Sequence, residues 1–228
     1  MDPKKAAALR AVELVQDGMV LGLGTGSTAV HVIDALGEKV RRSGWRVSAV
    51  PTSERSRNQA QSLGITLLDL GEAGPLDLAI DGADEADRQL SLIKGGGGAL
   101  LREKLVAAAA REFVVVADSS KLKQTLGAFP LPVAVVPFGW QSTARLLERF
   151  GVAMALRQRA APNAGPYLTD DGLHILDMQF GSIPDPSALE REIKQITGVV
   201  DVGLFVGMAS RLILGYEDGH VDEIFPSG

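Results

Sequence analysis

The sequence predicts an α/β protein in which a mostly parallel sheet is accompanied by a smaller α+β unit. Through the first half of the chain, continuous apolar runs alternate with segments of helical periodicity, as in parallel sheets whose two faces are covered by helices. A Pro-rich stretch, FPLPVAVVP at 129–137, then precedes a different order of elements. Near the end of the chain, an Asp218-Gly219 turn between two strand-like runs predicts a hairpin.

The first half is expected to form a Rossmann-like sheet with its connecting helices. Its expected strands are residues 19–24, 46–50, 65–70, 76–80 and 112–118. Start and stop signals place helices between Asp2–Pro3 and Gly18, between Thr28 and Gly44, and between Thr52 or Ser53 and Gly64. Because helices separate these apolar strands, we expect the strands to run parallel.

The second half is expected to form a ferredoxin-like α+β domain. Its elements follow in the order β-α-β-β-α-β, the split-βαβ pattern of that fold. We expect residues 130–206 to form this smaller domain, and residues 1–129 together with 207–228 to form the Rossmann-like catalytic domain. In chain order the expected elements are strand 131–136, helix 140–150, strands 152–157 and 173–179, helix 186–196 and strand 199–206.

The composition argues against several classes of protein. A formal charge of −5 and a pI near 5.3 do not suit a nucleic-acid or anionic membrane surface. No apolar run approaches the roughly 18 residues that span a bilayer, and Arg10 and Glu13 interrupt any signal-peptide core. The lack of cysteine excludes disulfides, thiol catalysis and thiolate metal sites. We therefore expect a cytoplasmic protein that binds neither nucleic acid nor membrane.

The turn LGLGTGST (21–28) places glycines between an expected strand and an expected helix. Free N–H groups at a helix N-terminus bind anions, and Thr25, Gly26, Ser27 and Thr28 add backbone and hydroxyl donors. A Walker loop would need a lysine before its Ser/Thr, and a dinucleotide loop would need glycine where Ser27 stands. The turn indicates a phosphate site, although a tight turn with a helix cap remains an alternative.

A second stretch, AIDGADEADRQLSLIKGGGGALLREK (79–104), combines three acids with a lysine and four consecutive glycines. Asp81 ends an expected strand, at the edge where α/β proteins bind ligands, and Asp84 follows a turn. Lys94 precedes Gly95–Gly98, and Glu103 lies about one turn into the next helix. Each charged residue alone could be a cap or a solvated charge. Together they indicate a site.

These motifs resemble those of the type A ribose-5-phosphate isomerase family. The order and spacing match, as does Lys121 after VVVADSS, and the resemblance runs nearly end to end. Gly98 departs from the family pattern, which has alanine there, and we expect it to loosen the start of the following helix. The motifs that carry the resemblance are GTGST at 24–28, DGADE at 81–85, KGGGGAL at 94–100 and REK at 102–104.

The resemblance implies an aldose–ketose isomerase of the pentose phosphate pathway. It would interconvert D-ribose 5-phosphate and D-ribulose 5-phosphate without a metal or organic cofactor, as a homodimer or homotetramer. Glu103 would be the base that moves a proton between C2 and C1 through an enediolate, and Lys94 would stabilise the oxyanion. Asp81 and Asp84 would bind sugar hydroxyls and assist ring opening. The implied substrate contacts are Lys4, Thr25, Gly26, Ser27, Thr28, Asp81, Gly82, Ala83, Asp84, Lys94, Gly95, Gly96, Gly97 and Lys121.

The chemistry of these residue types suits such a reaction. Proton abstraction next to a carbonyl needs a base and a positive or N–H-rich site for the oxyanion. A helix N-terminus favours an ionised Glu103, whereas burial and the nearby Asp81 and Asp84 favour the protonated form. The sequence leaves this balance open.

Other functions stay open as alternatives. An amino-sugar-phosphate deaminase or a lactonase would place a histidine in the site, but His31, His174 and His220 lie outside these motifs and have no metal-ligand spacing. A sugar-phosphate sensor would carry a DNA-binding module, for which we see no basic extension. A nicotinamide enzyme fits poorly because the third glycine and the ribose-binding acid are missing.

Overall fold

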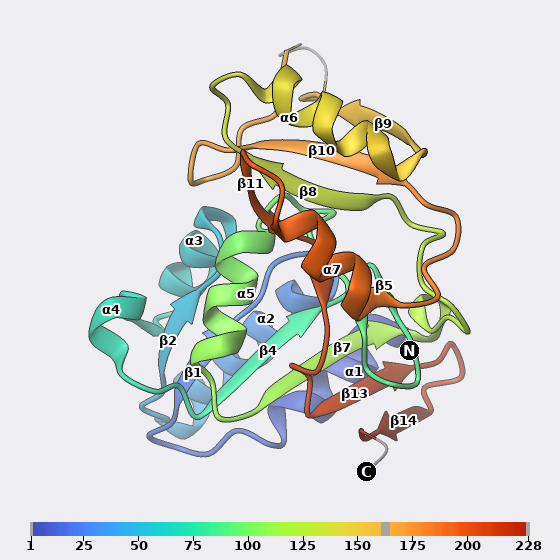
Figure 1. Ribbon diagram of the computed structural model, residues 1–228. Helices are drawn as coiled ribbons and strands as arrows, with labels where there is room; N and C mark the ends of the chain where they lie inside the picture. The colour runs from blue at the N-terminus through green and yellow to red at the C-terminus, as the bar shows by residue number, and fades with distance from the viewer. Residues whose placement is uncertain (1, 161–164, 227–228) are drawn as a thin grey trace.

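Seven strands form the central sheet of the computed structural model, which describes residues 2–160 and 165–226 (Figure 1). Their order is β14-β13-β7-β4-β1-β2-β3, and all neighbours are parallel except the antiparallel hairpin β13–β14. The Rossmann-like prediction is therefore confirmed. The strand bounds are β1 Val20–Leu23, β2 Ser48–Pro51, β3 Thr66–Leu67, β4 Leu78–Gly82, β7 Phe113–Asp118, β13 Arg211–Gly215 and β14 Val221–Ile224.

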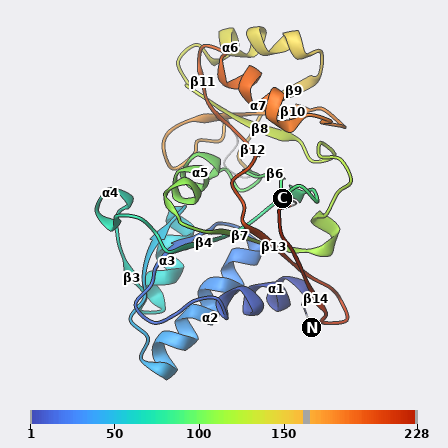
Figure 2. The same cartoon turned by 60° about the horizontal axis from the view of Figure 1, so that its bottom comes forward.

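Helices cover both faces of this sheet, with α1 and α2 below it and α5 above it in Figure 2. The side chains of β7 alternate between the two hydrophobic cores, one on each face of the sheet. Val114 and Val116 pack in the core that α1, α2 and α3 share, whereas Val115 and Ala117 pack in the core that contains Val106 of α5. This is the two-residue period of a strand buried on both faces. The helix bounds are α1 Pro3–Val12, α2 Ser27–Ser43, α3 Glu54–Ser62, α4 Leu70–Ala73 and α5 Leu100–Ala109.

A four-stranded antiparallel sheet forms the smaller unit, in the order β11-β8-β10-β9. Helices α6 and α7 pack on one face of it, and Ala134 and Ile175 on the other face pack against Leu100 at the start of α5. The ferredoxin-like β-α-β-β-α-β prediction is confirmed. The bounds are β8 Leu131–Val135, α6 Trp140–Leu147, β9 Ala153–Leu156, β10 His174–Gln179, α7 Pro186–Lys194 and β11 Val199–Val202.

The predicted strand 199–206 is interrupted at Gly203. Its second part, β12 (Leu204–Phe205), leaves the small sheet and pairs with β6 (Leu92–Ile93), which also pairs with β5 (Glu85–Ala86). A Cβ atom at residue 203 would lie 2.3 Å from the carbonyl oxygen of Lys94, so only glycine allows this close approach. The break therefore brings the small sheet against the segment that carries Lys94.

Two other predicted elements are much shorter in the structure. The strand expected at 65–70 has only two residues, because β3 is an edge strand and the carbonyl of Asp69 accepts from Glu72 and Ala73 to begin α4. Helix α1 ends at Val12 instead of continuing to Gly18, since the chain turns to bury Val15, which is 3% exposed. Both differences are tertiary effects at element ends, where local signals are weakest.

The hairpin β13–β14 returns the chain to the central sheet, where β13 runs parallel to β7. We therefore propose the domain division expected above, with residues 1–129 and 207–228 in one domain and 130–206 in the other. Within the described ranges, no helix is both long enough and apolar enough to cross a bilayer.

Candidate functional site

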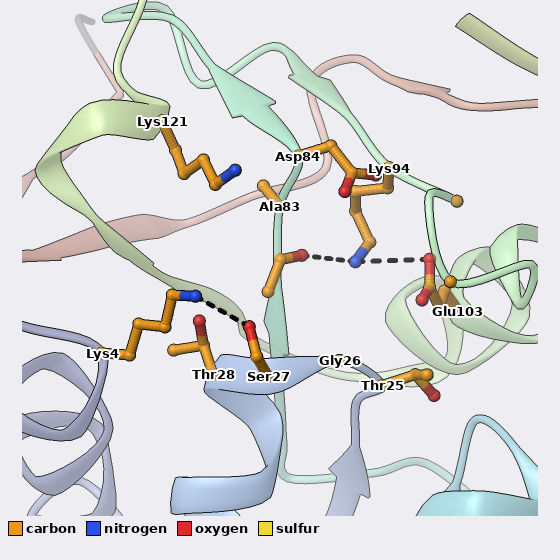
Figure 3. Close-up of a pocket in the computed structure, with 13 residues that line it drawn as sticks. Lys4, Thr25, Gly26, Ser27, Thr28, Ala83, Asp84, Lys94, Glu103 and Lys121 are labelled. Atoms are coloured by element: carbon orange, nitrogen blue, oxygen red, sulfur yellow. Dashed lines mark hydrogen bonds and ion pairs between the residues drawn. The ribbon is translucent and has the colours of Figure 1, made fainter. Parts of the chain in front are cut away.

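A pocket lies at the carboxyl ends of β1 and β4, where the two GTGST and DGADE segments meet (Figure 3). Each residue that lines it belongs to the set expected from the sequence. Of that set, Asp81 and Gly96 do not line the pocket but lie directly behind it. The lining residues are Lys4, Thr25, Gly26, Ser27, Thr28, Gly82, Ala83, Asp84, Lys94, Gly95, Gly97, Glu103 and Lys121.

One end of the pocket carries groups that can bind an anion. Ser27 begins α2, and Gly26 before it has a φ of +110°, which turns the chain from β1 into the helix. Lys4 donates from Nζ to Ser27 Oγ at 3.0 Å, and Lys121 faces the same end from the segment after β7 (Figure 3). Two ammonium groups, a hydroxyl and a helix N-terminus are suited to a phosphate.

The hydroxyl of Thr25 was expected to be a donor to the ligand, but in the structure it bonds to neighbouring side chains. Its Oγ1 bonds to Thr52 at 2.7 Å and to Ser53 at 2.8 Å, so the hydroxyl ties β1 to the start of α3. Its backbone N–H donates to Asp81 Oδ1 at 2.9 Å. The neighbouring Gly24 permits this, because a Cβ there would lie 2.0 Å from the same oxygen. Thr25 thus positions Asp81 instead of offering its hydroxyl to a ligand.

The opposite end of the pocket holds a buried cluster of Lys94, Asp81 and Glu103. Lys94 Nζ lies 2.9 Å from Asp81 Oδ2 and 3.4 Å from Glu103 Oε2, and it donates to the carbonyl of Gly82. The three side chains are at most 4% exposed. The Lys94 backbone N–H donates to Gly203 at 2.8 Å, so the short ladder around β6 and β12 holds the ammonium in place.

Burial sets the protonation of this cluster. It raises the pKa of Glu103 to about 8; Lys94 opposes the shift, whereas the charges of Asp81 and Asp84 add to it. Burial would by itself lower the pKa of Lys94, but Asp81 and Glu103 outweigh it and raise that pKa, so the ammonium stays charged. Lys94 pairs with Asp81, and a second anion beside that pair, at Glu103, is disfavoured. Burial therefore outweighs the helix N-terminus at Glu103.

Asp84 faces the pocket from the turn after β4. Burial raises its pKa, against the lowering effect of the hydrogen bond that Gly96 N–H donates to its Oδ2 at 2.7 Å. A Cβ at residue 96 would lie 2.5 Å from Asp84 Oδ1, which explains glycine at that position. The two acids of the DGADE segment thus differ, with Asp81 paired behind the pocket and Asp84 available within it.

Gly98 has a different role from the one expected. It has a φ of +85°, and a Cβ there would lie 2.3 Å from the hydroxyl oxygen of Tyr167, a group that donates to Gly97 O at 3.3 Å. The residue thus allows a left-handed turn and leaves room for Tyr167, instead of merely loosening α5.

The change Gly98→Ala is expected to lower the free energy of unfolding by about 1–2 kcal/mol for the positive φ alone. It should also displace Tyr167. Gly18→Ala is the matched control, because Gly18 has a similar φ of +88° with nothing within 4 Å of a Cβ. Urea unfolding of both variants checks this, and equal losses in the two would show that Tyr167 is not affected.

The three histidines lie outside the pocket. His31 is 3.5 Å from Asp2, His174 contacts the Tyr167 carbonyl, and His220 pairs with Asp222 on the terminal hairpin. Within the part of the chain that the structure describes, no group of three or more His, Cys, Asp or Glu side chains could hold a metal. The catalytic histidine that a deaminase or a lactonase would use is thus not among the lining residues.

Arg157 and Phe205 belong to the surroundings of the site, and the sequence motifs did not indicate either. Arg157 donates to the carbonyls of Gly95 and Gly96 from the small sheet, and the ring of Phe205 lies 5.4 Å from Lys94 Nζ. Both are far from the motifs along the chain. Arg157 ends the expected strand 152–157 and Phe205 lies in the expected strand 199–206, and neither strand was expected to contribute to the site.

Comparison with known proteins agrees with this geometry. The family model described as ribose 5-phosphate isomerase A (phosphoriboisomerase A) matches residues 48–219. The ribose-5-phosphate isomerase A of Gloeobacter violaceus is 54% identical, over 98% of this chain and 96% of that protein. The protein of the same name from Ruegeria sp. (strain TM1040) is 50% identical, over 96% of this chain and 85% of that protein.

Solved structures of the same kind superpose closely. Ribose 5-phosphate isomerase A from Methanocaldococcus jannaschii has a TM-score of 0.92 and 41% identity, with 97% of each chain covered. A D-ribose-5-phosphate isomerase solved in complex with phospho-erythronic acid has a TM-score of 0.94 and 37% identity, with 99% of this chain and 100% of that chain covered. On the family model and on these identities, the chain belongs to the ribose 5-phosphate isomerase A family.

Proposed function

We propose that the protein interconverts D-ribose 5-phosphate and D-ribulose 5-phosphate by proton transfer through an enediolate. The observation that carries this proposal is the buried contact between Glu103 and Lys94, which places a carboxyl base 3.4 Å from an ammonium at one end of the pocket. The other end offers phosphate donors. Family membership supports the same reaction.

The proposed steps use Glu103 twice, first as the base and then as the acid, and Lys94 as the positive partner of the reacting oxygen. Glu103 removes the proton from C2 of the open-chain aldose, and the electron pair moves to the C1 oxygen, which Lys94 stabilises. The same carboxylic acid then returns the proton to C1, while the proton of the C2 hydroxyl passes to the C1 oxygen, so that C2 becomes the ketone and C1 becomes the CH2OH group. A positioned base contributes about 10²–10⁴-fold and one oxyanion donor about 10²–10³-fold. The ammonium supplies positive charge beside the reacting oxygens, so we propose that no metal or organic cofactor is needed.

We further propose that the remaining pocket residues bind the substrate. Asp84 and the Gly95–Gly97 backbone would contact the sugar hydroxyls, and Asp84 would assist opening of the ring with Asp81 behind it. The phosphate would lie between Lys4, Lys121 and the start of α2. The lysine Nζ to Ser27 Oγ distance of 3.0 Å supports this placement, since both groups converge on the helix end.

The pH dependence of the reaction follows from the pKa of Glu103, about 8. A base must be deprotonated, so kcat/KM is expected to fall about tenfold per pH unit below about pH 8 and to level off above it. Initial rates between about pH 4 and about pH 9.5 measure this. The substrate phosphate titrates at about pH 6, so its protonation produces a separate fall in kcat/KM at lower pH. An acid limb at the ordinary glutamate value, near 4.5, would contradict the role of burial.

A direct assay tests the proposed reaction. Purified protein is incubated with ribose 5-phosphate and EDTA, and the formation of ribulose 5-phosphate is followed. Conversion in EDTA supports metal-free proton transfer. Binding of ribose 5-phosphate without conversion indicates a sensor, and no binding removes both functions.

We also propose a homodimer or homotetramer in the cytoplasm. The support for an oligomer is the apolar surface near α6, where Phe138 is 94% exposed and Leu146 is 50% exposed. The support for the compartment is the lack of cysteine. Sedimentation equilibrium of the purified protein tests the oligomeric state.

A further inference from the structure

Arg157 connects the small sheet to the glycine segment of the pocket. It follows β9, and its Nε donates to Asp177 on β10 at 2.9 Å while Nη2 contacts the other carboxylate oxygen. The remaining nitrogen, Nη1, donates to Gly95 O at 2.8 Å and to Gly96 O at 3.1 Å. The planar guanidinium thus holds one carboxylate on one side and two consecutive carbonyls on another.

The geometry of the peptide bond carries this contact to the pocket. In a trans peptide the C=O and N–H groups point in opposite directions. When Gly95 O points to Arg157, the N–H of Gly96 points away from it, and this N–H donates to Asp84 Oδ2 at 2.7 Å. The Gly95–Gly96 peptide therefore lies between a guanidinium and a carboxylate, and each charge polarises it in the same sense.

The next peptide is oriented in the same way. Because Gly96 O also points to Arg157, the N–H of Gly97 is directed away from the guanidinium, and Gly97 lines the pocket. Among residues 2–160 and 165–226, no acceptor takes a hydrogen bond from Gly97 N–H. Arg157 thus leaves one backbone donor oriented for a ligand and another holding Asp84.

Glycines need such external support. A run of four glycines has the greatest backbone freedom of any sequence, and ordering each residue costs about 1–2 kcal/mol. Two of these glycines have positive φ, +101° at Gly95 and +85° at Gly98. Charge-assisted hydrogen bonds from a side chain that Asp177 already immobilises can hold the two central peptides in one orientation.

We propose that Arg157 is a positioning residue of the isomerase reaction, which sets the direction of the Gly96 and Gly97 N–H groups toward Asp84 and the substrate. This inference rests on the proposed function. It makes the small sheet part of the active site, although Arg157 itself does not line the pocket. The alternative is a tie that merely joins the two sheets, with no effect on the reaction.

The experiment compares Arg157→Met with Arg159→Met. Arg159 is the matched control because it is exposed, lies on the same segment and donates to Pro166 O, away from the glycines. Arg157→Met is expected to lower kcat about 10–100-fold, since misplacing catalytic groups by about 1 Å costs up to about 10²-fold. Its KM should change less than kcat, because the phosphate donors are untouched. Arg159→Met should retain the normal kcat.

Two further measurements separate positioning from stability. Arg157→Lys keeps the charge but cannot bond both carbonyls and Asp177 in one plane, so it should lose nearly as much kcat. If Arg157→Met does not fold, Arg157→Lys decides in its place. Arg157→Ala should regain kcat when millimolar guanidinium ion is added, because the free ion can bind the same carboxylate and carbonyls.

Several outcomes would overturn the inference. A folded Arg157→Met or Arg157→Lys with kcat within twofold of the unchanged protein would do so, as would an Arg157→Ala variant that guanidinium does not rescue. Failure of the proposed function would look different. In that case the unchanged protein itself would not convert ribose 5-phosphate, whereas failure of this inference leaves it fully active.

Discussion

Glu103→Gln is expected to reduce kcat by about 10³-fold or more while ribose 5-phosphate still binds, since a glutamine cannot accept the proton from C2. The variant should also fold normally at pH 7. The pKa of Glu103 is raised to about 8, so the native side chain is mostly a neutral carboxylic acid at that pH, and an amide of the same shape replaces it well. Steady-state rates measure the loss of kcat, and calorimetry measures the retained binding of ribose 5-phosphate.

Glu72→Gln is the control for this variant. Glu72 also lies in the first turn of a helix, α4, but it is exposed. It should leave both kcat and stability unchanged. A Glu103→Gln protein that keeps more than a tenth of the normal kcat would remove Glu103 from the role of the base.

The change Lys94→Met should damage both activity and stability. Without the ammonium, the developing oxyanion loses its positive partner, and kcat should fall about 10²–10³-fold, more than binding weakens. Asp81 would also remain buried without its counter-charge, and breaking such a pair costs about 3–5 kcal/mol of unfolding free energy. Steady-state kinetics and urea unfolding measure the two losses.

A second substitution separates these effects. Lys94→Met with Asp81→Asn removes both charges of the pair, so it should recover much of the stability but none of the kcat. Lys104→Met is the control, because Lys104 pairs with Asp201 at 2.9 Å, lies 4.9 Å from the centre of the Phe205 ring and lies outside the pocket. It should lose stability but keep kcat. If Lys94→Met raised only KM, Lys94 would act as a binding group without a share in the chemistry.

Much of the fold could be predicted from local pattern. Apolar runs and stop signals were sufficient for the parallel sheet and for the ferredoxin-like unit, because both follow from the period and order of the elements. The errors fell where one element meets another. Strand 65–70 shortened because it lies at a sheet edge, and strand 199–206 broke at Gly203, where the backbone of Lys94 comes too close for any side chain.

The site, too, could be predicted from the sequence only in part. The motifs predicted which residues gather, since strands that run parallel end at the same edge and their loops meet there. They did not predict that the Thr25 hydroxyl faces Thr52, or that Gly98 makes room for Tyr167. Those two contacts join segments that are distant along the chain, and no local period reports them.

By itself the sequence determined the family, the parallel sheet with its smaller α+β unit, and the set of residues around the pocket, because short motifs in fixed order carry that information. Only the tertiary structure decided the direction of the Glu103 pKa shift and the contacts of Arg157. Burial raises the pKa of Glu103 and outweighs the effect of the helix N-terminus. The extent of that burial depends on which segments of the whole chain pack around the carboxyl group. The hydrogen bond from Arg157 to Gly95 joins residues 62 apart along the chain and depends on the small sheet. Desolvation and long-range hydrogen bonds act through space, and a linear pattern records neither.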